Sequence, residues 1–436
     1  MRILFITASY LPESVGGVEL HLAGLVRSMT AAGHECMVLC RAASADVPHL
    51  SVTRDRHEGT EVVRVGNTFE DATTLRRLYA HEGLADVVLG VVAEWAPDVC
   101  HVHHLTCLST AILEGLAEAG VPSVMTLHDF WMGCPRGQRI TASLQPCPAI
   151  KLDACVPCLR ELWPHLLGPG RAPDQSAEEQ LAGDKALLED YHADIRRSLG
   201  AVDALVTPSA FMARMFEDYG LPQGSVTVVE NGLNTADYAH VTHQSSGAPL
   251  RIGFIGSVLP SKGVHLLLEA FRLLGDPSGL RLDVWGEVLP FHNDRTYGER
   301  LNALCEGYES VITLHGAYDN GQLPEILSSL DVVVVPSLWY EAFCLTIREA
   351  FLAGVAVITA NHGAMAEAVD DGVTGLLFEP GNAQSLGLAM RRLADNPGLR
   401  QRLSQCADRV RDEQQCADEL LALYGRVSSP DGATSS

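Results

Sequence analysis

The chain has 436 residues, of which 47% are hydrophobic and 19% charged. This is the composition of a globular protein, and it is longer than one hydrophobic core usually supports, so we expect two domains. The formal net charge of -23 excludes nucleic acid as the main partner, because a phosphate backbone requires a local excess of cations. It also gives no general attraction to an anionic membrane surface.

The sequence offers no transmembrane segment, since no apolar run reaches the ~18 residues that span a bilayer. The first residues, MRILFITASYLPES, contain only a short apolar run before proline, glutamate and serine. We interpret them as a buried strand rather than a secretion signal. We therefore predict a cytoplasmic protein with reduced cysteines, and leave open a peripheral contact with the inner face of a membrane through a local basic patch.

Short β-branched runs alternate with helix-length amphipathic segments along the chain, which is typical of βαβ units and parallel sheets. Strands are expected at residues 3–7, 36–40, 98–103, 123–127, 204–207, 251–255, 281–285, 311–314, 331–335 and 355–359. A polar, turn-rich join at 242–249 separates the two halves. We predict an α/β protein with domains at 1–245 and 246–427 and a disordered tail at 428–436.

A cysteine-rich insert at about 134–176 interrupts the first domain and is followed by a charged helix at 178–199. Four cysteines fall within 25 residues of this insert: Cys134, Cys147, Cys155 and Cys158. Four thiolates with one C-x-x-C pair suffice for a tetrahedral structural zinc site, although the spacing is not that of a standard finger. Reduced cysteines that simply pack in the loop remain the alternative.

Two turns that follow expected strands carry glycines next to a helix. Gly16 and Gly17 precede the first helix, where adjacent glycines let a ligand approach backbone amides closely. The first strand of the second half ends at Gly256, and Lys262 stands before the next helix. A lysine at a helix N-terminus opposes the helix dipole, so this placement favours a bound anion such as a diphosphate.

Two carboxylates stand in the mostly apolar stretch PSLWYEAFCLTIREAFLAG, which begins at residue 336. Glu341 follows a buried strand, and Glu349 lies near the second turn of the next helix. Their separation of eight residues is a little over two helical turns, so both acids are expected on one side. A carboxylate accepts two hydrogen bonds at once and suits the vicinal hydroxyls of a sugar, whereas a solvated helix face is the structural alternative.

The segment PSLWYEAFCLTIREAFLAGVAVITANHGAMAEAVDDGVTGLLFEPGN resembles the donor-binding signature of retaining glycosyltransferases with the GT-B fold, the large family 4 group. Further similar segments follow in the family's order: MRILFITASYLPESVGGVELHLAGL, DVCHVHH, TLHDFW, TPSAFM, VVENGLN and GSVLPSKGVHLLLEAF. The resemblance covers residues 1 to about 390. It implies two Rossmann-like, doubly wound parallel-sheet domains that face a cleft, with the acceptor bound by the first and a sugar nucleotide by the second.

The resemblance also implies roles for individual residues. Glu341, His128 and Lys262 would be catalytic, with Lys262 stabilising the leaving diphosphate and the other two contacting the donor sugar. Glu349 would bind the ribose. The donor-binding set implied as a whole is Gly17, Gly256, Lys262, Glu341, Cys344, Leu345, Thr346 and Glu349.

The chain departs from the family's pattern at three positions. Ser257 stands where many members have an arginine, Cys344 stands at a usual glycine, and Ala364 at another. Arg348 is a candidate to replace the missing cation. His101, His103 and His104 also end an expected strand, where ligand-binding residues occur, but core or turn histidines are the more common case.

We therefore predict a retaining glycosyltransferase that moves a sugar from a nucleotide-diphosphate donor to a glycan or lipid-linked glycan acceptor. Trp339 and Tyr340 resemble a subgroup tied to surface-polysaccharide or glycoconjugate assembly. No cofactor is expected for catalysis. A non-catalytic sugar-nucleotide-binding module and another GT-B chemistry, such as an epimerase, remain the alternatives.

Overall fold

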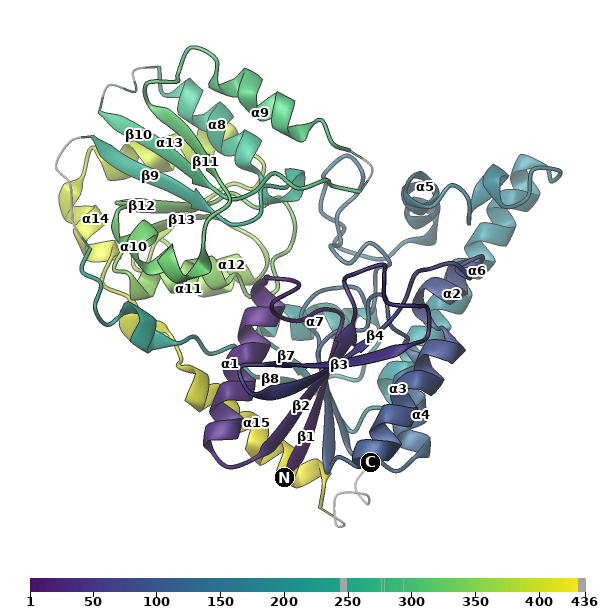
Figure 1. Ribbon diagram of the computed structural model, residues 1–436. Helices are drawn as coiled ribbons and strands as arrows, with labels where there is room; N and C mark the ends of the chain where they lie inside the picture. Colours follow the sequence, from purple (N-terminus) through teal and green to yellow (C-terminus); the bar gives the residue numbers. More distant parts are fainter. Residues whose placement is uncertain (244–248, 276, 278, 293, 430–436) are drawn as a thin grey trace. The chain divides into compact units, whose positions relative to one another are not determined.

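The computed structural model describes residues 1–243, 249–275, 277, 279–292 and 294–429, which form two compact units (Figure 1). The N-terminal unit consists of Met1–Gly137, Pro148–Gly232 and the segment from Glu413 onward. The C-terminal unit consists of Gln138–Cys147 and Leu233–Asp412. Each unit has its own sheet with helices packed on it, which confirms the predicted α/β class.

The N-terminal unit contains an eight-stranded sheet in the order β3-β4-β2-β1-β5-β6-β7-β8. Its strands are β1 Arg2–Thr7, β2 Glu35–Arg41, β3 Val52–His57, β4 Thr60–Val65, β5 Val99–Val102, β6 Ser123–Thr126, β7 Ala204–Thr207 and β8 Val226–Val228. All neighbouring strands are parallel except β3 and β4, which form a hairpin. The hairpin turns through Glu58 and Gly59, both at positive φ.

The helices of this unit are α1 Gly17–Ala31, α2 Leu75–Tyr79, α3 Glu82–Trp95, α4 Ala111–Glu118, α5 Leu152–Leu162, α6 Ala177–Gly200, α7 Ala210–Tyr219 and α15 Glu413–Val427. In Figure 1, α1 and α15 lie side by side on one face of the sheet, and α3 and α4 lie together on the other. Because helices cover both faces, the central strands read as continuous apolar runs.

The C-terminal unit contains a fully parallel six-stranded sheet in the order β11-β10-β9-β12-β13-β14. Its strands are β9 Leu250–Ile255, β10 Leu280–Trp285, β11 Ile312–Gly316, β12 Val332–Val335, β13 Ala356–Ala360 and β14 Leu376–Phe378. Numbered within the unit, this is the 3-2-1-4-5-6 order of a doubly wound dinucleotide-binding sheet. Such sheets bind ligands where the strand order reverses, which here is the carboxyl edge of β9 and β12.

Its helices are α8 Val264–Leu273, α9 Tyr297–Cys305, α10 Leu323–Ser328, α11 Leu345–Leu352, α12 Gly363–Ala368, α13 Ala383–Ala394 and α14 Pro397–Leu403. A short 3-10 turn at Pro260–Lys262 precedes α8. One continuous core joins the strands to the inner faces of α8, α11 and α13.

The units divide the chain differently from the predicted domains. Helix α15 belongs to the N-terminal unit, although the sequence placed it at the end of the second domain. Its buried residues Leu420 and Tyr424 share a core with Leu22 and Val26 of α1. The first boundary falls at Gly232, earlier than predicted, because the following turn packs on the C-terminal core. The predicted boundary at 245/246 and most of the predicted tail lie outside the described residues.

The cysteine-rich insert is more ordered than the sequence suggests. Cys155 and Cys158 lie on α5, and the buried Asp184 of α6 ties this helix down. Asp184 accepts a hydrogen bond from the Arg160 guanidinium at 2.7 Å and one from the backbone N–H of Gly168 at 2.7 Å. The charge-assisted contacts fix the return from α5 to α6.

Candidate functional site

The strand-order reversal of the C-terminal unit brings together two of the predicted donor-site residues, one from the turn before α8 and one from the loop after β12. The Lys262 ammonium lies 2.7 Å from Oε1 of Glu341. The same oxygen accepts hydrogen bonds from the Ser337 hydroxyl at 2.7 Å and the Trp339 indole N–H at 2.8 Å. Among the described residues, these three side chains all contact Oε1, which leaves Oε2 for a ligand.

The backbone of Gly263 makes the approach of Lys262 to Glu341 geometrically feasible. Gly263 has φ of +73°, and a Cβ there would stand 2.1 Å from the carbonyl oxygen of Pro336. The turn before α8 is therefore pressed against the end of β12, which only glycine permits. This places the lysine beside the Ser337–Glu341 loop.

Burial and charge act in opposite directions on Lys262. Burial alone would lower its pKa, but the Glu341 carboxylate raises the pKa above its usual value, so the lysine stays charged. The sequence analysis predicted that this lysine lies near a helix N-terminus and binds an anion. In the structure, Glu341 already supplies one negative charge to it.

Glu349 occupies the second turn of α11, as predicted, and is partly buried. Burial raises the pKa of this carboxyl to about 7. The pKa values of Tyr238 and Tyr318 are raised by burial and then by the Glu349 charge, so both phenols lie close to it. A carboxyl held half-protonated near neutral pH is typical of functional sites.

Glu341 and Glu349 do not share a helix, so helical periodicity does not determine whether the two acids face the same side. Helix α11 begins at Leu345, so Glu341 lies outside it, in the loop after β12. The loop ends at Cys344, which caps the helix in the left-handed conformation with φ of +61°. A side chain at such a position costs roughly 1–2 kcal/mol, which accounts for the glycine that the family pattern has there.

Arg348, the candidate to replace the cation missing at Ser257, contacts the loop before α11. Its guanidinium donates a hydrogen bond to the Phe343 carbonyl and lies 3.9 Å from the centre of the Phe343 ring. The side chain is buried. These contacts hold the loop that carries Cys344 and the amides of Leu345 and Thr346.

An aromatic pair stands at the carboxyl ends of β10 and β11. The rings of Trp285 and His315 are parallel, with centroids 3.6 Å apart. Asp283 orients the imidazole through a 2.7 Å contact with Nε2. The two residues lie thirty positions apart in the chain and meet only because their strands pair.

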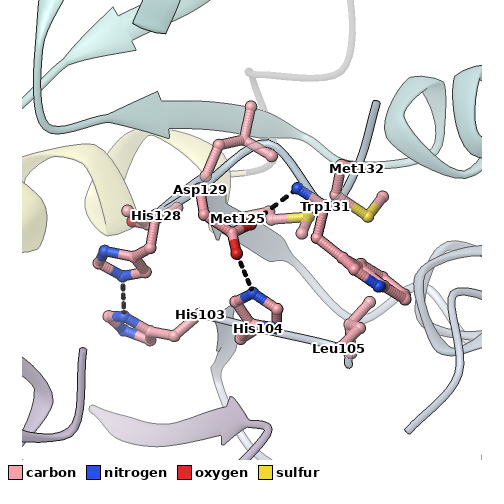
Figure 2. A pocket seen from close by; sticks show the side chains of 10 residues that line it. His103, His104, Leu105, Met125, His128, Asp129, Trp131 and Met132 are labelled. Atoms are coloured by element: carbon pink, nitrogen blue, oxygen red, sulfur yellow. Dashed lines mark hydrogen bonds and ion pairs between the residues drawn. The ribbon is translucent and has the colours of Figure 1, made fainter. Parts of the chain in front are cut away.

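The N-terminal unit gathers histidines where its own strand order reverses, between β1 and β5. His128 lies after β6, and its Nε2 is 2.8 Å from Nδ1 of His103 at the end of β5. Next to this pair, the His104 imidazole contacts the Asp129 carboxylate at 3.1 Å. Figure 2 shows these residues around a small pocket that Trp131 and Met132 also line.

These histidines differ in protonation. Burial lowers the pKa of His103 and His128 well below the usual range, and the neighbouring imidazoles lower it further. Burial alone would lower the pKa of His104 too, but the Asp129 carboxylate raises it above the usual value. His128 is therefore neutral near pH 7, able to donate or accept a hydrogen bond.

His101 is a core residue. It is fully buried, and its two ring nitrogens contact the hydroxyls of Tyr424 and Thr126. It thus joins β5 to α15. Gly17, by contrast, opens α1 at an exposed position beside the strand-order reversal, where the sequence predicted close approach of a ligand.

The cysteine prediction is not tested by the structure. Cys147 belongs to the short hairpin 139–147, grouped with the C-terminal unit, whereas Cys134, Cys155 and Cys158 belong to the N-terminal unit. Within the described ranges, the groups with three metal-ligand atoms within 4.8 Å of one another consist of histidines and one aspartate, not these cysteines. A structural zinc stays a prediction.

Comparison with known proteins identifies the family. The model described as Glycosyltransferase Family 4 matches residues 15–237, and that described as Glycosyl transferases group 1 matches residues 239–410. This chain is a group 1 glycosyltransferase. It is therefore an enzyme of the transferase class. Membership of this family favours the predicted glycosyltransferase over the binding-module and epimerase alternatives.

Relatives and solved structures agree with this family. Glycogen synthase of Mycobacterium tuberculosis is 28% identical over 93% of this chain and 89% of its own. Lipopolysaccharide 1,2-N-acetylglucosaminetransferase of Salmonella typhimurium is 29% identical, over 42% of this chain and 50% of its own. Sucrose-phosphate synthase of Thermosynechococcus elongatus superposes with a TM-score of 0.70 at 17% identity, covering 98% of both chains.

HepE of Anabaena, solved in complex with UDP, matches with a TM-score of 0.66 at 17% identity, over 98% of this chain and 100% of its own. The glycosyltransferase therefore has the GT-B fold, with two Rossmann-like parallel-sheet domains. Among the helices of the described residues, none combines the length and the apolar character required to cross a membrane.

Proposed function

We propose that this glycosyltransferase moves a sugar from a nucleotide-diphosphate donor to a glycan or lipid-linked glycan acceptor, with retention of the anomeric configuration. The observation that carries the proposal is the Lys262–Glu341 pair at the strand-order reversal of the C-terminal unit. It joins a cation suited to a diphosphate with a carboxylate suited to sugar hydroxyls. Glu349 supplies a second carboxylate from α11 of the same unit.

The chemistry requires the bond between the anomeric carbon and the diphosphate oxygen to break, and a bond from that carbon to an acceptor hydroxyl oxygen to form. The electron pair leaves with the diphosphate, which also takes up the hydroxyl proton. Lys262 and the backbone amides at the start of α11 stabilise the developing negative charge. These groups are fixed before reaction by Glu341 and Arg348, so little reorganisation is needed.

Glu341 and Glu349 have different tasks in this proposal. Oε1 of Glu341 is held by Lys262, Ser337 and Trp339, and Oε2 accepts a hydroxyl of the transferred sugar. Glu349 accepts the ribose hydroxyls. His128 contacts the donor sugar as a neutral imidazole. Because the ribose contact is the same in the ground and transition states, Glu349 acts mainly on donor affinity, whereas Glu341 acts mainly on turnover.

The names of some relatives support a glycan or glycoconjugate as the acceptor. They include a glycogen synthase, a lipopolysaccharide transferase and a colanic acid glycosyltransferase, all of which act on glycans or glycoconjugates. HepE was also solved with UDP-glucose. UDP-glucose is therefore the first donor to test, and we assign the enzyme to surface-polysaccharide or glycoconjugate assembly.

The test begins with a thermal-stability screen of UDP-, GDP- and ADP-sugars. A true donor at ~100 times its dissociation constant stabilises the protein by ~2.7 kcal/mol. With the donor known, transfer to oligosaccharide acceptors is followed in the presence of EDTA, and the anomeric configuration of the product is read by NMR. Retention, release of nucleoside diphosphate and undiminished activity in EDTA are expected.

An inverted product would overturn the retaining assignment. Loss of activity in EDTA would instead overturn the proposal that Lys262 and the amides of α11 replace a metal. Lys262→Ala should lower the rate of transfer. Lys151→Ala, which replaces an exposed lysine in the N-terminal unit, is its matched control and should transfer sugar like wild type.

A further inference from the structure

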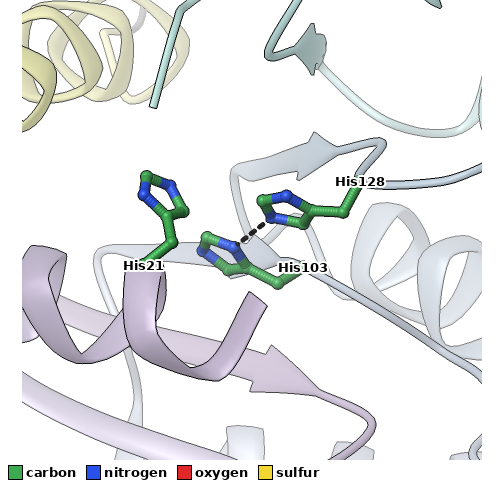
Figure 3. A group of neighbouring side chains, drawn as sticks. All are labelled: His21, His103 and His128. Atoms are coloured by element: carbon green, nitrogen blue, oxygen red, sulfur yellow. Dashed lines mark hydrogen bonds between the residues drawn. The ribbon is translucent and has the colours of Figure 1, made fainter. Parts of the chain in front are cut away.

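Three histidines from three separate elements of the N-terminal unit converge at its strand-order reversal. His21 comes from the second turn of α1, His103 from the end of β5 and His128 from the residues after β6, as Figure 3 shows. The ring centroid of His21 lies 6.1 Å from that of His103 and 5.6 Å from that of His128. One ring nitrogen of each residue lies within 4.8 Å of the other two.

The cluster is buried, and its hydrogen bonding is incomplete. The exposed fractions of His21, His103 and His128 are 6%, 1% and 8%. Nδ1 of His103 contacts Nε2 of His128, but Nε2 of His103 finds no hydrogen-bond partner among the described residues. A buried polar atom without a partner is destabilising, so the geometry favours a ligand that this nitrogen can bind.

A second group, formed by His49, Asp71 and His81, provides a useful contrast. Nδ1 of His81 accepts a hydrogen bond from the backbone N–H of Leu84 and caps α3, so in the neutral ring Nε2 carries the proton. That Nε2–H faces Asp71 at 2.8 Å, and the Arg77 guanidinium lies 2.8 Å from the same carboxylate. The Asp71 carboxylate thus already accepts the His81 proton and is paired with the positive charge of Arg77. The second group is therefore not suited to a cation.

We infer that His21, His103 and His128 form a binding site for a divalent transition-metal ion of the Zn²⁺ class. Three neutral imidazoles with no carboxylate among them match the ligands preferred by zinc, copper or nickel, whereas magnesium and calcium prefer oxygen. Three protein ligands leave a fourth position for water or a substrate oxygen.

The required rearrangement is small. With zinc–nitrogen distances of about 2.0–2.1 Å, two ligand nitrogens of a tetrahedral site are separated by about 3.3 Å. One ring nitrogen of each histidine lies within 4.8 Å of the other two, so these separations would shorten by up to about 1.5 Å when an ion is bound. The wider spacing of His21 would shorten through side-chain rotation. Asp129, next to His128, and its partner His104 form a polar surround on one side.

Metal binding has a functional consequence that rests on the proposed function. His128 is the residue that resemblance assigns to the donor sugar. An ion that holds its imidazole would withdraw it from the sugar and inhibit transfer reversibly. Binding itself is measured without activity, so failure of the metal site and failure of the proposed reaction are distinguishable.

The test uses the full chain stripped of metal with a chelator, in a Cys155→Ser background that removes one insert cysteine. Cobalt(II) is titrated as a spectroscopic substitute for zinc, and zinc affinity is measured by competition with a chromophoric chelator. We expect one ion per chain, an intense tetrahedral cobalt spectrum and no thiolate charge-transfer absorption. His21→Gln should weaken binding at least tenfold, whereas His240→Gln, at an exposed histidine, should match the parent.

Unchanged affinity in His21→Gln, or a weak octahedral cobalt spectrum, would overturn the site. If His21→Gln fails to fold, X-ray absorption of the zinc-loaded parent protein decides, because it counts imidazole ligands directly; fewer than three would refute the inference. In active protein, zinc should inhibit sugar transfer by the parent. At least tenfold more zinc should be needed to inhibit His21→Gln to the same extent.

Discussion

Replacing Glu349 with glutamine removes the charge of a carboxyl whose pKa burial raises from 4.5 to about 7. A rise of about 2.5 units corresponds to roughly 3 kcal/mol against ionisation in the folded protein. Between these two pKa values the folded chain binds more protons than the unfolded chain. The free energy of unfolding therefore falls as pH rises through this window, and the full loss is present above pH 7.

Glu349→Gln abolishes this loss, so we expect it to be up to about 3 kcal/mol more stable than wild type at pH 8 and close to wild type at pH 4.5. Urea unfolding at the two pH values measures the difference. Glu299→Gln, at an exposed position of α9, is the matched control, and its stability should differ from that of wild type by the same amount at both pH values. A Glu349→Gln stability that tracks wild type at both pH values would refute the raised pKa.

The same carboxylate must be ionised to accept the ribose hydroxyls. Binding of the nucleoside diphosphate should then tighten with rising pH, and at pH 6, where about a tenth of Glu349 is ionised, it should be about tenfold weaker than its limit. The terminal phosphate also titrates near ~6, so the informative quantity is the ratio of wild-type to Glu349→Gln affinity at each pH. Calorimetry that gives a constant ratio from pH 6 to pH 8 would rule out the ribose contact.

Other residues give predictions of different kinds. Lys262→Ala should lower kcat/KM by about 10- to 100-fold, since a charge-assisted contact contributes ~1.5–3 kcal/mol, and an unchanged value removes the lysine from the site. Glu341→Ala should lower kcat more than donor affinity, as steady-state kinetics with direct binding would reveal; equal effects on both would contradict its role at the sugar. Cys155→Ser should lower the zinc content by about one per chain in metal analysis, and an equal content in both proteins retires the cysteine site. Leu420→Ala should cost about 2–5 kcal/mol in urea unfolding, because this side chain is 1% exposed in the core shared by α1 and α15.

The sequence by itself determined the local elements and the class of the enzyme. All ten expected strands are present to within two residues, and the expected charged helix is α6. Buried strands of parallel sheets are short continuous apolar runs, which local pattern reveals. The hairpin β3–β4 and the three-residue strands β8 and β14 were missed, because β3 is largely exposed and polar and the others are too short for a pattern.

Only the tertiary structure decided which side chains meet. Lys262 and Glu341 are 79 positions apart and touch because Gly263 packs against the end of β12. The pairing of His103 with His128 and the approach of His21 follow from the order of strands in the sheet, which no local periodicity specifies. Likewise α15 carries the pattern of any amphipathic helix, and its return to the N-terminal unit follows from the fit of Tyr424 against His101, a contact between residues 323 positions apart. Such contacts depend on burial and strand order together, so they appear only once the chain is folded.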